Sequence, residues 1–65
     1  LVGENLTINN VDFVKEICII NLQGNMLKSV SDSKNIELSD ISSGIYILKI
    51  TDKNNKISIQ KFIKK

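Results

Sequence analysis

The chain has 65 residues, and nine lysines against seven acidic residues give it a net charge of +2. A chain of this length buries only about 60% of the surface that its unfolded form exposes, so we expect one domain with a thin core. The single cysteine, Cys18, excludes an internal disulfide, and the absence of histidine excludes a Cys/His zinc cluster and a nucleophile paired with histidine. We therefore expect no enzymatic activity, no cofactor and no metal site.

The composition indicates an all-β fold. Twelve residues are isoleucine and four are valine, whereas alanine is absent. β-Branched side chains pack well on a pleated sheet, and without alanine no window of the chain favours a helix. No apolar run approaches the roughly 20 residues of a membrane span, and no signal peptide is visible. Because the chain does not begin with methionine, we expect Leu1 to be an internal position of a longer precursor.

Alternating apolar and polar residues predict three strands in the first half of the chain. They are Asn5–Asn9, Glu16–Asn21 and Met26–Ser31. In the second of these, Ile17 and Ile19 face one way while Cys18 and Ile20 face the other, which predicts a central strand covered on both sides. Cys18 is accordingly expected to be buried and unreactive. The polar turn that follows ends at Gly24, which can adopt the left-handed conformation of a type I turn with a bulge.

The second half of the chain predicts three more strands. They are a short strand at Ile36–Leu38, a strand at Gly44–Ile50 and a closing strand at Ile57–Lys65. Ile41 is the only large apolar residue between the first two of these, so we expect it to close one end of the core. The turn between the last two, Asp52–Lys56, is rich in asparagine, which tolerates a positive φ. Six or seven short strands joined by polar turns predict a small immunoglobulin-like antiparallel β-sandwich.

Positive charge gathers at the C-terminal end. Residues 1–48 hold three lysines against six acidic residues, whereas residues 49–65 hold six lysines against one aspartate. In the closing strand either Phe62 or Ile63 must point away from the core, and an exposed apolar residue beside lysines suits docking. The alternative is simple core packing, with the lysines protecting an open edge strand from unwanted pairing. An open edge can also pair with a partner's sheet or with a second copy of the chain.

Several motifs follow one another in a fixed order along the chain. Gly24 closes a turn after a strand, a Gly-x-Tyr-x-Leu-x-Ile run falls on Gly44, Tyr46, Leu48 and Ile50, and the sequence ends with Lys61, Phe62, Ile63, Lys64 and Lys65. In order and spacing these motifs resemble the type A C-terminal sorting domain of the type IX secretion system of Bacteroidetes. The resemblance covers nearly the whole chain, although the Asn-Pro-rich start of the family is missing.

The resemblance implies that residues 1–65 are a sorting domain at the C-terminus of a secreted or cell-surface cargo protein. Such a cargo crosses the inner membrane, is recognised in the periplasm and then passes through the outer-membrane translocon. The resemblance also implies that a sortase-like cysteine protease removes the domain and attaches many cargoes to the cell surface. We expect the translocon to recognise Lys61–Lys65, and we expect the chemistry to belong to the protease.

A carbohydrate-binding or adhesive sandwich module is the alternative function. Such modules stack sugar rings on exposed aromatic side chains, and this chain offers only Phe13, Tyr46 and Phe62. Binding to nucleic acid is not expected, because the basic end has no arginine to grip phosphate and too few aromatic residues to stack on bases.

Overall fold

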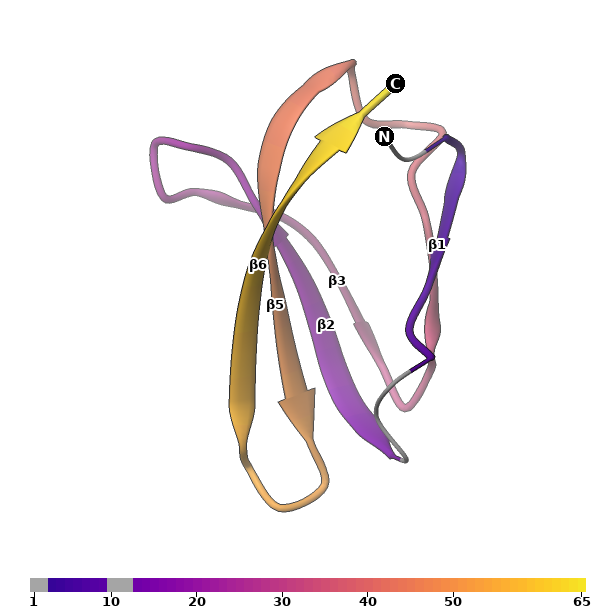
Figure 1. Cartoon of the computed structure of the whole chain (residues 1–65), viewed down its shortest axis with the longest axis vertical. Coiled ribbons are helices and arrows are strands. Elements are labelled where there is room, and N and C mark those ends of the chain that lie inside the picture. Colours follow the sequence, from indigo (N-terminus) through magenta and orange to yellow (C-terminus); the bar gives the residue numbers. More distant parts are fainter. Residues whose placement is uncertain (1–2, 10–12) are drawn as a thin grey trace.

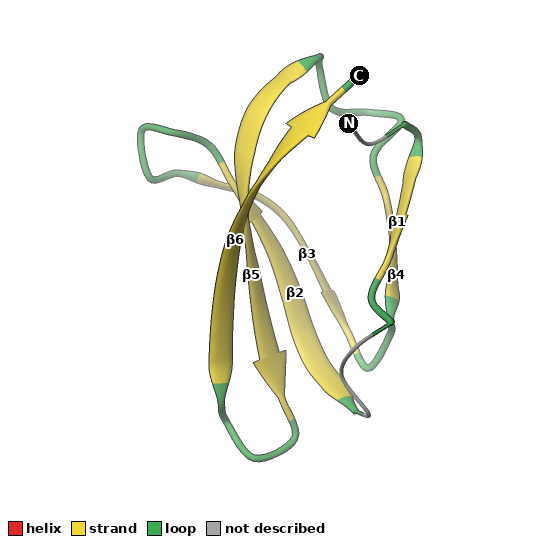
Figure 2. Ribbon diagram, in the orientation of Figure 1, coloured by secondary structure: helices red, strands yellow, loops and turns green. Residues whose placement is uncertain are grey.

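The computed structural model describes residues 3–9 and 13–65, so that Leu1 lies outside the described residues. This part of the chain is all-β, and it contains no helix that could span a membrane (Figures 1 and 2). The strands are β1 (Asn5–Thr7), β2 (Val14–Ile20), β3 (Met26–Ser31), β4 (Asn35–Glu37), β5 (Gly44–Asp52) and β6 (Ile57–Lys64).

The strands form two antiparallel sheets of unequal size. The larger has the order β3-β2-β5-β6, and the smaller consists of β1 and β4 alone. The small sheet stands opposite the large one (Figure 2), which gives the sandwich-like arrangement that the sequence predicts. β2 lies between two neighbours, as predicted, whereas β3 and β6 are edge strands.

The predicted strand boundaries differ from the observed ones in every strand except β3. β4 (Asn35–Glu37) lies one residue earlier than the predicted strand at Ile36–Leu38, and β5 continues two residues beyond its predicted end, to Asp52. β1 ends at Thr7, two residues before the predicted end, although the Ile8 N–H still donates to the Lys34 carbonyl at 2.7 Å. β2 begins at Val14, two residues before the predicted start, and ends at Ile20. Its pairing with β5 shifts in register between Val14 and Glu16, and this shift breaks the alternation of apolar and polar residues in the sequence. The closing strand ends one residue before Lys65, since its last partner on β5 is Gly44.

The core lies between the two sheets. Its buried members are Ile8, Val14, Ile17, Ile19, Ile36, Leu38, Leu48 and Ile50. Ile41 packs against this cluster, as predicted. The other face of the large sheet, which we call the outer face, carries Cys18, Ile20, Ile45, Ile47, Lys49, Ile57, Ile59, Lys61 and Ile63. The predicted cover on both faces of β2 is confirmed at Cys18, which is 5% exposed on the outer face, whereas Ile20 on the same face is only half-buried.

Both hairpins of the large sheet use the same turn. Between β2 and β3, the side-chain oxygen of Asn21 accepts hydrogen bonds from the N–H groups of Gln23 and Asn25 at 3.0 and 2.9 Å. The Asn21 carbonyl accepts from the N–H of Gly24, whose φ is 92°. This is the turn with a left-handed residue that was predicted at Gly24.

The turn between β5 and β6 repeats this design with an aspartate. One carboxylate oxygen of Asp52 accepts from the N–H groups of Asn54 and Lys56 at 2.8 and 2.9 Å. Asn55 takes the left-handed position with a φ of 63°, which confirms the expectation that asparagine supports a positive φ here. Two rigid turns thus fix the register of β2 with β3 and of β5 with β6.

Candidate functional site

The C-terminal strand is held along its whole length. β6 pairs with β5 from the Thr51–Ile57 pair to the Gly44–Lys64 pair without a break in register. Its other edge has no neighbouring strand in the described part of the chain. Residues up to Lys64 are therefore displayed at a fixed place on the molecule, and the end of β6 lies at the opposite end of the hairpin from the Asp52–Lys56 turn (Figure 1).

Phe62 and Ile63 point to opposite faces of the sheet. Phe62 packs against the core and lies beside Tyr46, with the ring centroids 5.8 Å apart. Ile63 is 47% exposed on the outer face, opposite Ile45 of β5. The sequence left open which of the two leaves the core, and the structure identifies Ile63.

The Gly-x-Tyr motif fixes the start of β5. The Tyr46 hydroxyl donates a hydrogen bond to the Ser42 carbonyl at 2.6 Å, so the tyrosine ties the preceding loop to the strand, as expected for a core tyrosine with a backbone partner. A Cβ on Gly44, whose φ is 156°, would lie 3.6 Å from that hydroxyl. Leu48 and Ile50 are buried in the core. These motif residues, like Gly24 in its turn, shape the fold.

The three terminal lysines do not form one cluster. Lys61 is exposed on the outer face opposite Ile47, Lys64 is half-buried opposite Gly44, and Lys65 follows the strand and is exposed. The one ion pair within residues 3–9 and 13–65 joins Lys28 to Asp40, so no described carboxylate neutralises the terminal lysines. The positive charge of this end is available to a partner.

Residues that the sequence did not single out lie beside this end. A hollow of about 360 Å³ separates the β2–β3 turn from the start of β5, and the exposed side chains of Leu22, Leu27 and Ile45 line it. The only sequence signal for this hollow was that apolar residues bracket the polar turn at Gly24.

Comparison with known families agrees with this geometry. A family model described as the secretion system C-terminal sorting domain matches residues 2–65. The chain belongs to this family. Its members are C-terminal sorting signals of the type IX secretion system, which implies a Bacteroidetes protein, a secreted or cell-surface cargo, and interaction with the type IX machinery. The family is one of sorting signals and not a catalytic one. No curated protein and no solved structure matches the chain.

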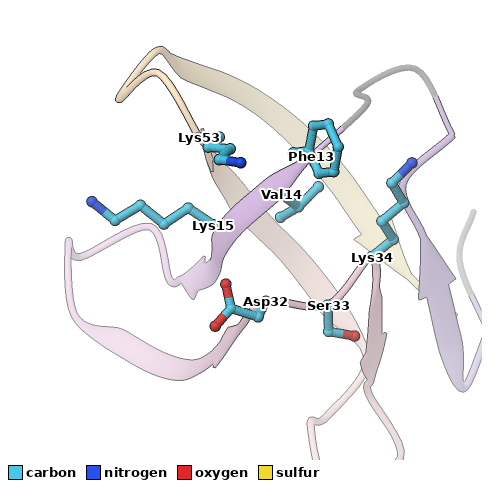
Figure 3. A pocket seen from close by; sticks show the side chains of 7 residues that line it. All are labelled: Phe13, Val14, Lys15, Asp32, Ser33, Lys34 and Lys53. Carbon is cyan, nitrogen blue, oxygen red and sulfur yellow. The ribbon is translucent and has the colours of Figure 1, made fainter.

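The sorting domain has a second hollow, of about 330 Å³, near the β5–β6 turn (Figure 3). The Lys53 ammonium lies 5.0 Å from the centre of the Phe13 ring. Lys15 and Lys34 point away from it in different directions, and Lys15 donates to the Asn55 side chain at 2.9 Å. The lysines around the hollow therefore do not converge on one point, and Lys53 covers one face of the Phe13 ring.

The arrangement of the aromatic residues bears on the alternative of a sugar-binding module. Phe13 is 63% exposed, but Lys53 lies over its ring, and Tyr46 and Phe62 pack on one another. The sorting domain thus lacks a row of exposed aromatic rings on which sugars could stack, and nothing in its geometry favours that alternative.

Cys18 of the sorting domain is a buried thiol on the outer face of β2. Burial raises its pKa above the ordinary value, and the nearby Glu16 carboxylate adds to the effect. Burial was predicted and is confirmed. Nowhere in residues 3–9 and 13–65 do three or more Cys, Asp or Glu side chains gather as metal ligands would.

Proposed function

We propose that Lys61–Lys65 are the part of the sorting domain that the type IX translocon recognises. The observation that carries the proposal is the pairing of β6 with β5 up to Lys64, which presents a cationic strand end in a defined geometry. These lysines form no ion pair with a carboxylate of the described residues, which supports the proposal, since an unpaired charge strengthens attraction to an acidic partner.

We further propose the route of the cargo that carries this domain. The cargo crosses the inner membrane, folds in the periplasm and is delivered to the outer-membrane translocon. A sortase-like cysteine protease then removes residues 1–65 and attaches the cargo to the cell surface. Family membership supports this route, and the protease supplies the covalent chemistry.

The charge of the strand end is tested by a triple substitution of Lys61, Lys64 and Lys65 to alanine in the cargo protein, in a bacterium with a type IX system. The backbone ladder and the packing of Phe62 remain in this variant, so we expect the domain to stay folded while secretion falls at least tenfold. The matched control replaces Lys53 and Lys56 at the far end of the same hairpin. Those changes leave secretion at the normal level if the strand end is what matters.

Deletion of Lys61–Lys65 is the more severe test. It removes the Tyr46–Phe62 contact and four strand pairs as well as the charge, so the folded state of the cargo in the periplasm is checked by its own activity. We expect folded cargo to accumulate in the periplasm. Normal secretion of the truncated cargo contradicts the proposal.

A further inference from the structure

The outer face of the large sheet is rich in isoleucine. Half of the twelve isoleucines of the chain point to this face rather than to the core. Across β2, β5 and β6 the paired residues form rows: Glu16–Thr51–Ile57, Cys18–Lys49–Ile59, Ile20–Ile47–Lys61 and Ile45–Ile63. Because each row extends across neighbouring strands, the apolar side chains form one continuous surface.

Much of this surface is open to solvent. Ile59 is 66% exposed, Ile57 54%, Ile63 47% and Ile45 45%. The surface continues at Ile45 into the hollow of about 360 Å³ beside the β2–β3 turn, where Leu22 and Leu27 are also exposed. Contiguous exposed apolar surface of this kind marks sites of interaction, because removing apolar side chains from water into an interface is favourable.

Lysines lie inside the apolar rows rather than around them. Lys49 stands between Cys18 and Ile59, and Lys61 stands next to Ile47. Glu16, at the edge of the first row, is the one carboxylate on this face among the described residues. A surface that covers the isoleucines must therefore meet two ammonium groups at the same time.

We propose that the outer face of β2, β5 and β6 is a docking surface for a protein whose own apolar surface carries carboxylate side chains. Such a partner covers the isoleucines and pairs Lys49 and Lys61 with its carboxylates as water leaves, which avoids burying unpaired charge. The proposal rests on the proposed function, because the partner is a component of the secretion machinery. It extends recognition from the strand end to the whole face of the hairpin.

Charge argues against two other occupants. A second copy of the chain brings two lysines to the interface and only one carboxylate, so each copy leaves a positive charge without a partner. A lipid bilayer can bury the isoleucines in its hydrocarbon core. Lys49 and Lys61 lie in the same rows, so they are brought close to the hydrocarbon, where a charged side chain is costly. A protein surface can satisfy both requirements of this face.

The test compares substitutions on the two faces of β6 in the full cargo protein. Ile59→Gln places an amide on the outer face, and Ser58→Gln places the same side chain on the other face one residue earlier; both positions are exposed. We expect Ile59→Gln to reduce secretion at least tenfold, with an unchanged thermal midpoint, and Ser58→Gln to have no effect. Lys49→Glu is expected to reduce secretion, Lys49→Arg to preserve it, and Lys56→Glu in the turn to serve as the charge control.

Comparison with the triple lysine variant separates the two proposals. If the loss of Lys61, Lys64 and Lys65 stops secretion while Ile59→Gln is secreted normally, the docking face is wrong and recognition of the strand end stands. If both variants are secreted normally, both proposals are wrong. If both fail to be secreted, the face and the strand end are each needed.

The chemistry of the partner is tested with the photoreactive residue p-benzoylphenylalanine at position 59, activated in living cells. Sequencing of the cross-linked peptide is expected to show aliphatic residues interspersed with Asp or Glu from a protein of the secretion machinery. A cross-link to a second copy of the cargo, or to lipid, overturns the proposal. So does binding of the cargo to vesicles of phosphatidylethanolamine and phosphatidylglycerol that is lost in Ile59→Gln.

Discussion

Tyr46 of β5 and Phe62 of β6 face one another across the strand ladder, with ring centroids 5.8 Å apart and planes inclined by 34°. The same tyrosine donates its hydroxyl to the Ser42 carbonyl at 2.6 Å. One side chain therefore connects the loop that enters β5 with the strand that ends the domain. The stability of the terminal strand and that of the loop are coupled through this ring.

Tyr46→Phe tests the hydrogen bond separately from the ring. The variant keeps the contact with Phe62 but leaves the Ser42 carbonyl without the hydroxyl, so we expect a loss of about 1 kcal/mol in the free energy of unfolding. Urea denaturation measures the change. Tyr46→Leu, which also removes the aromatic contact, is expected to lose more, and equal stability of Tyr46→Phe and the native chain contradicts the assignment.

Asn55→Ala tests the left-handed turn between β5 and β6. Asparagine tolerates a φ of 63° better than alanine does, so we expect Asn55→Ala to lose about 1 kcal/mol in the free energy of unfolding, whereas Asn55→Gly is expected to be tolerated. Asn54→Ala is the matched control, because that side chain takes no part in the turn hydrogen bonds, which Asn54 makes through its backbone N–H. A chemical denaturation series of the three variants gives the comparison, and equal losses for Asn54→Ala and Asn55→Ala rule the explanation out.

Ile19→Ala tests the core. Ile19 is fully buried, and its truncation leaves a cavity that costs about 2–5 kcal/mol, a large share of the stability of so small a domain. Ile59→Ala removes the same atoms from the outer face and is expected to change stability by less than about 0.5 kcal/mol. Thermal unfolding followed by circular dichroism distinguishes the two, and a similar cost at both positions is the result that disagrees with the structure.

Cys18 is predicted to resist alkylation in the folded chain. Burial raises its pKa, so the thiol stays protonated at pH 8 and is shielded from reagents. Because the folded pKa lies above the unfolded one, the stabilisation is complete below the unfolded pKa and is lost as the pH rises through the folded pKa. Iodoacetamide labelling with and without urea measures this protection, and rapid labelling of the folded chain would be inconsistent with it.

Asp40 is predicted to titrate below its ordinary pKa of 3.8, because the Lys28 ammonium donates a hydrogen bond to its carboxylate at 3.1 Å. The contribution to stability is present above pH 3.8 and disappears as the pH falls through the lower folded pKa. In Lys28→Met the pKa of Asp40 is expected to rise toward the ordinary value. A carboxyl titration by NMR gives both values, and an unshifted Asp40 in the native chain counts against the ion pair.

The alternation of apolar residues predicted most of the fold because each of the six strands has at least one apolar residue that is buried in the core or packs against it. It predicted β3 with its observed bounds, Met26–Ser31. The irregular start of β2 was missed because a shift in register breaks the alternation at Lys15. The hydrogen bonds of the Lys28 ammonium to the Glu37 carbonyl and to Asp40 were also missed. Their partners are 9 and 12 positions away in the sequence, and contacts at such separations leave no local pattern.

The candidate site was only partly predictable for the same reason. The sequence located the cationic end of the chain, but alternation alone could not decide whether Phe62 or Ile63 leaves the core, since both are large and apolar. It indicated that both faces of β2 are apolar without indicating what covers them. The hollow at Leu22 and Leu27 depends on where the β2–β3 turn lies relative to β5, which is a tertiary relationship.

β6 contributes no buried residue to the core, and only Phe62 packs against it. The strand is attached to the domain by its hydrogen bonds to β5, by that ring and by side-chain pairs across the ladder such as Ile45–Ile63. A pulling force applied at Lys65 therefore breaks the β5–β6 pairs one after another, starting with Gly44–Lys64, while Ile17, Ile19 and Leu38 remain packed in the core. The mechanical resistance of the domain is directional: its C-terminal end can be peeled away by a motor that does not unfold the rest.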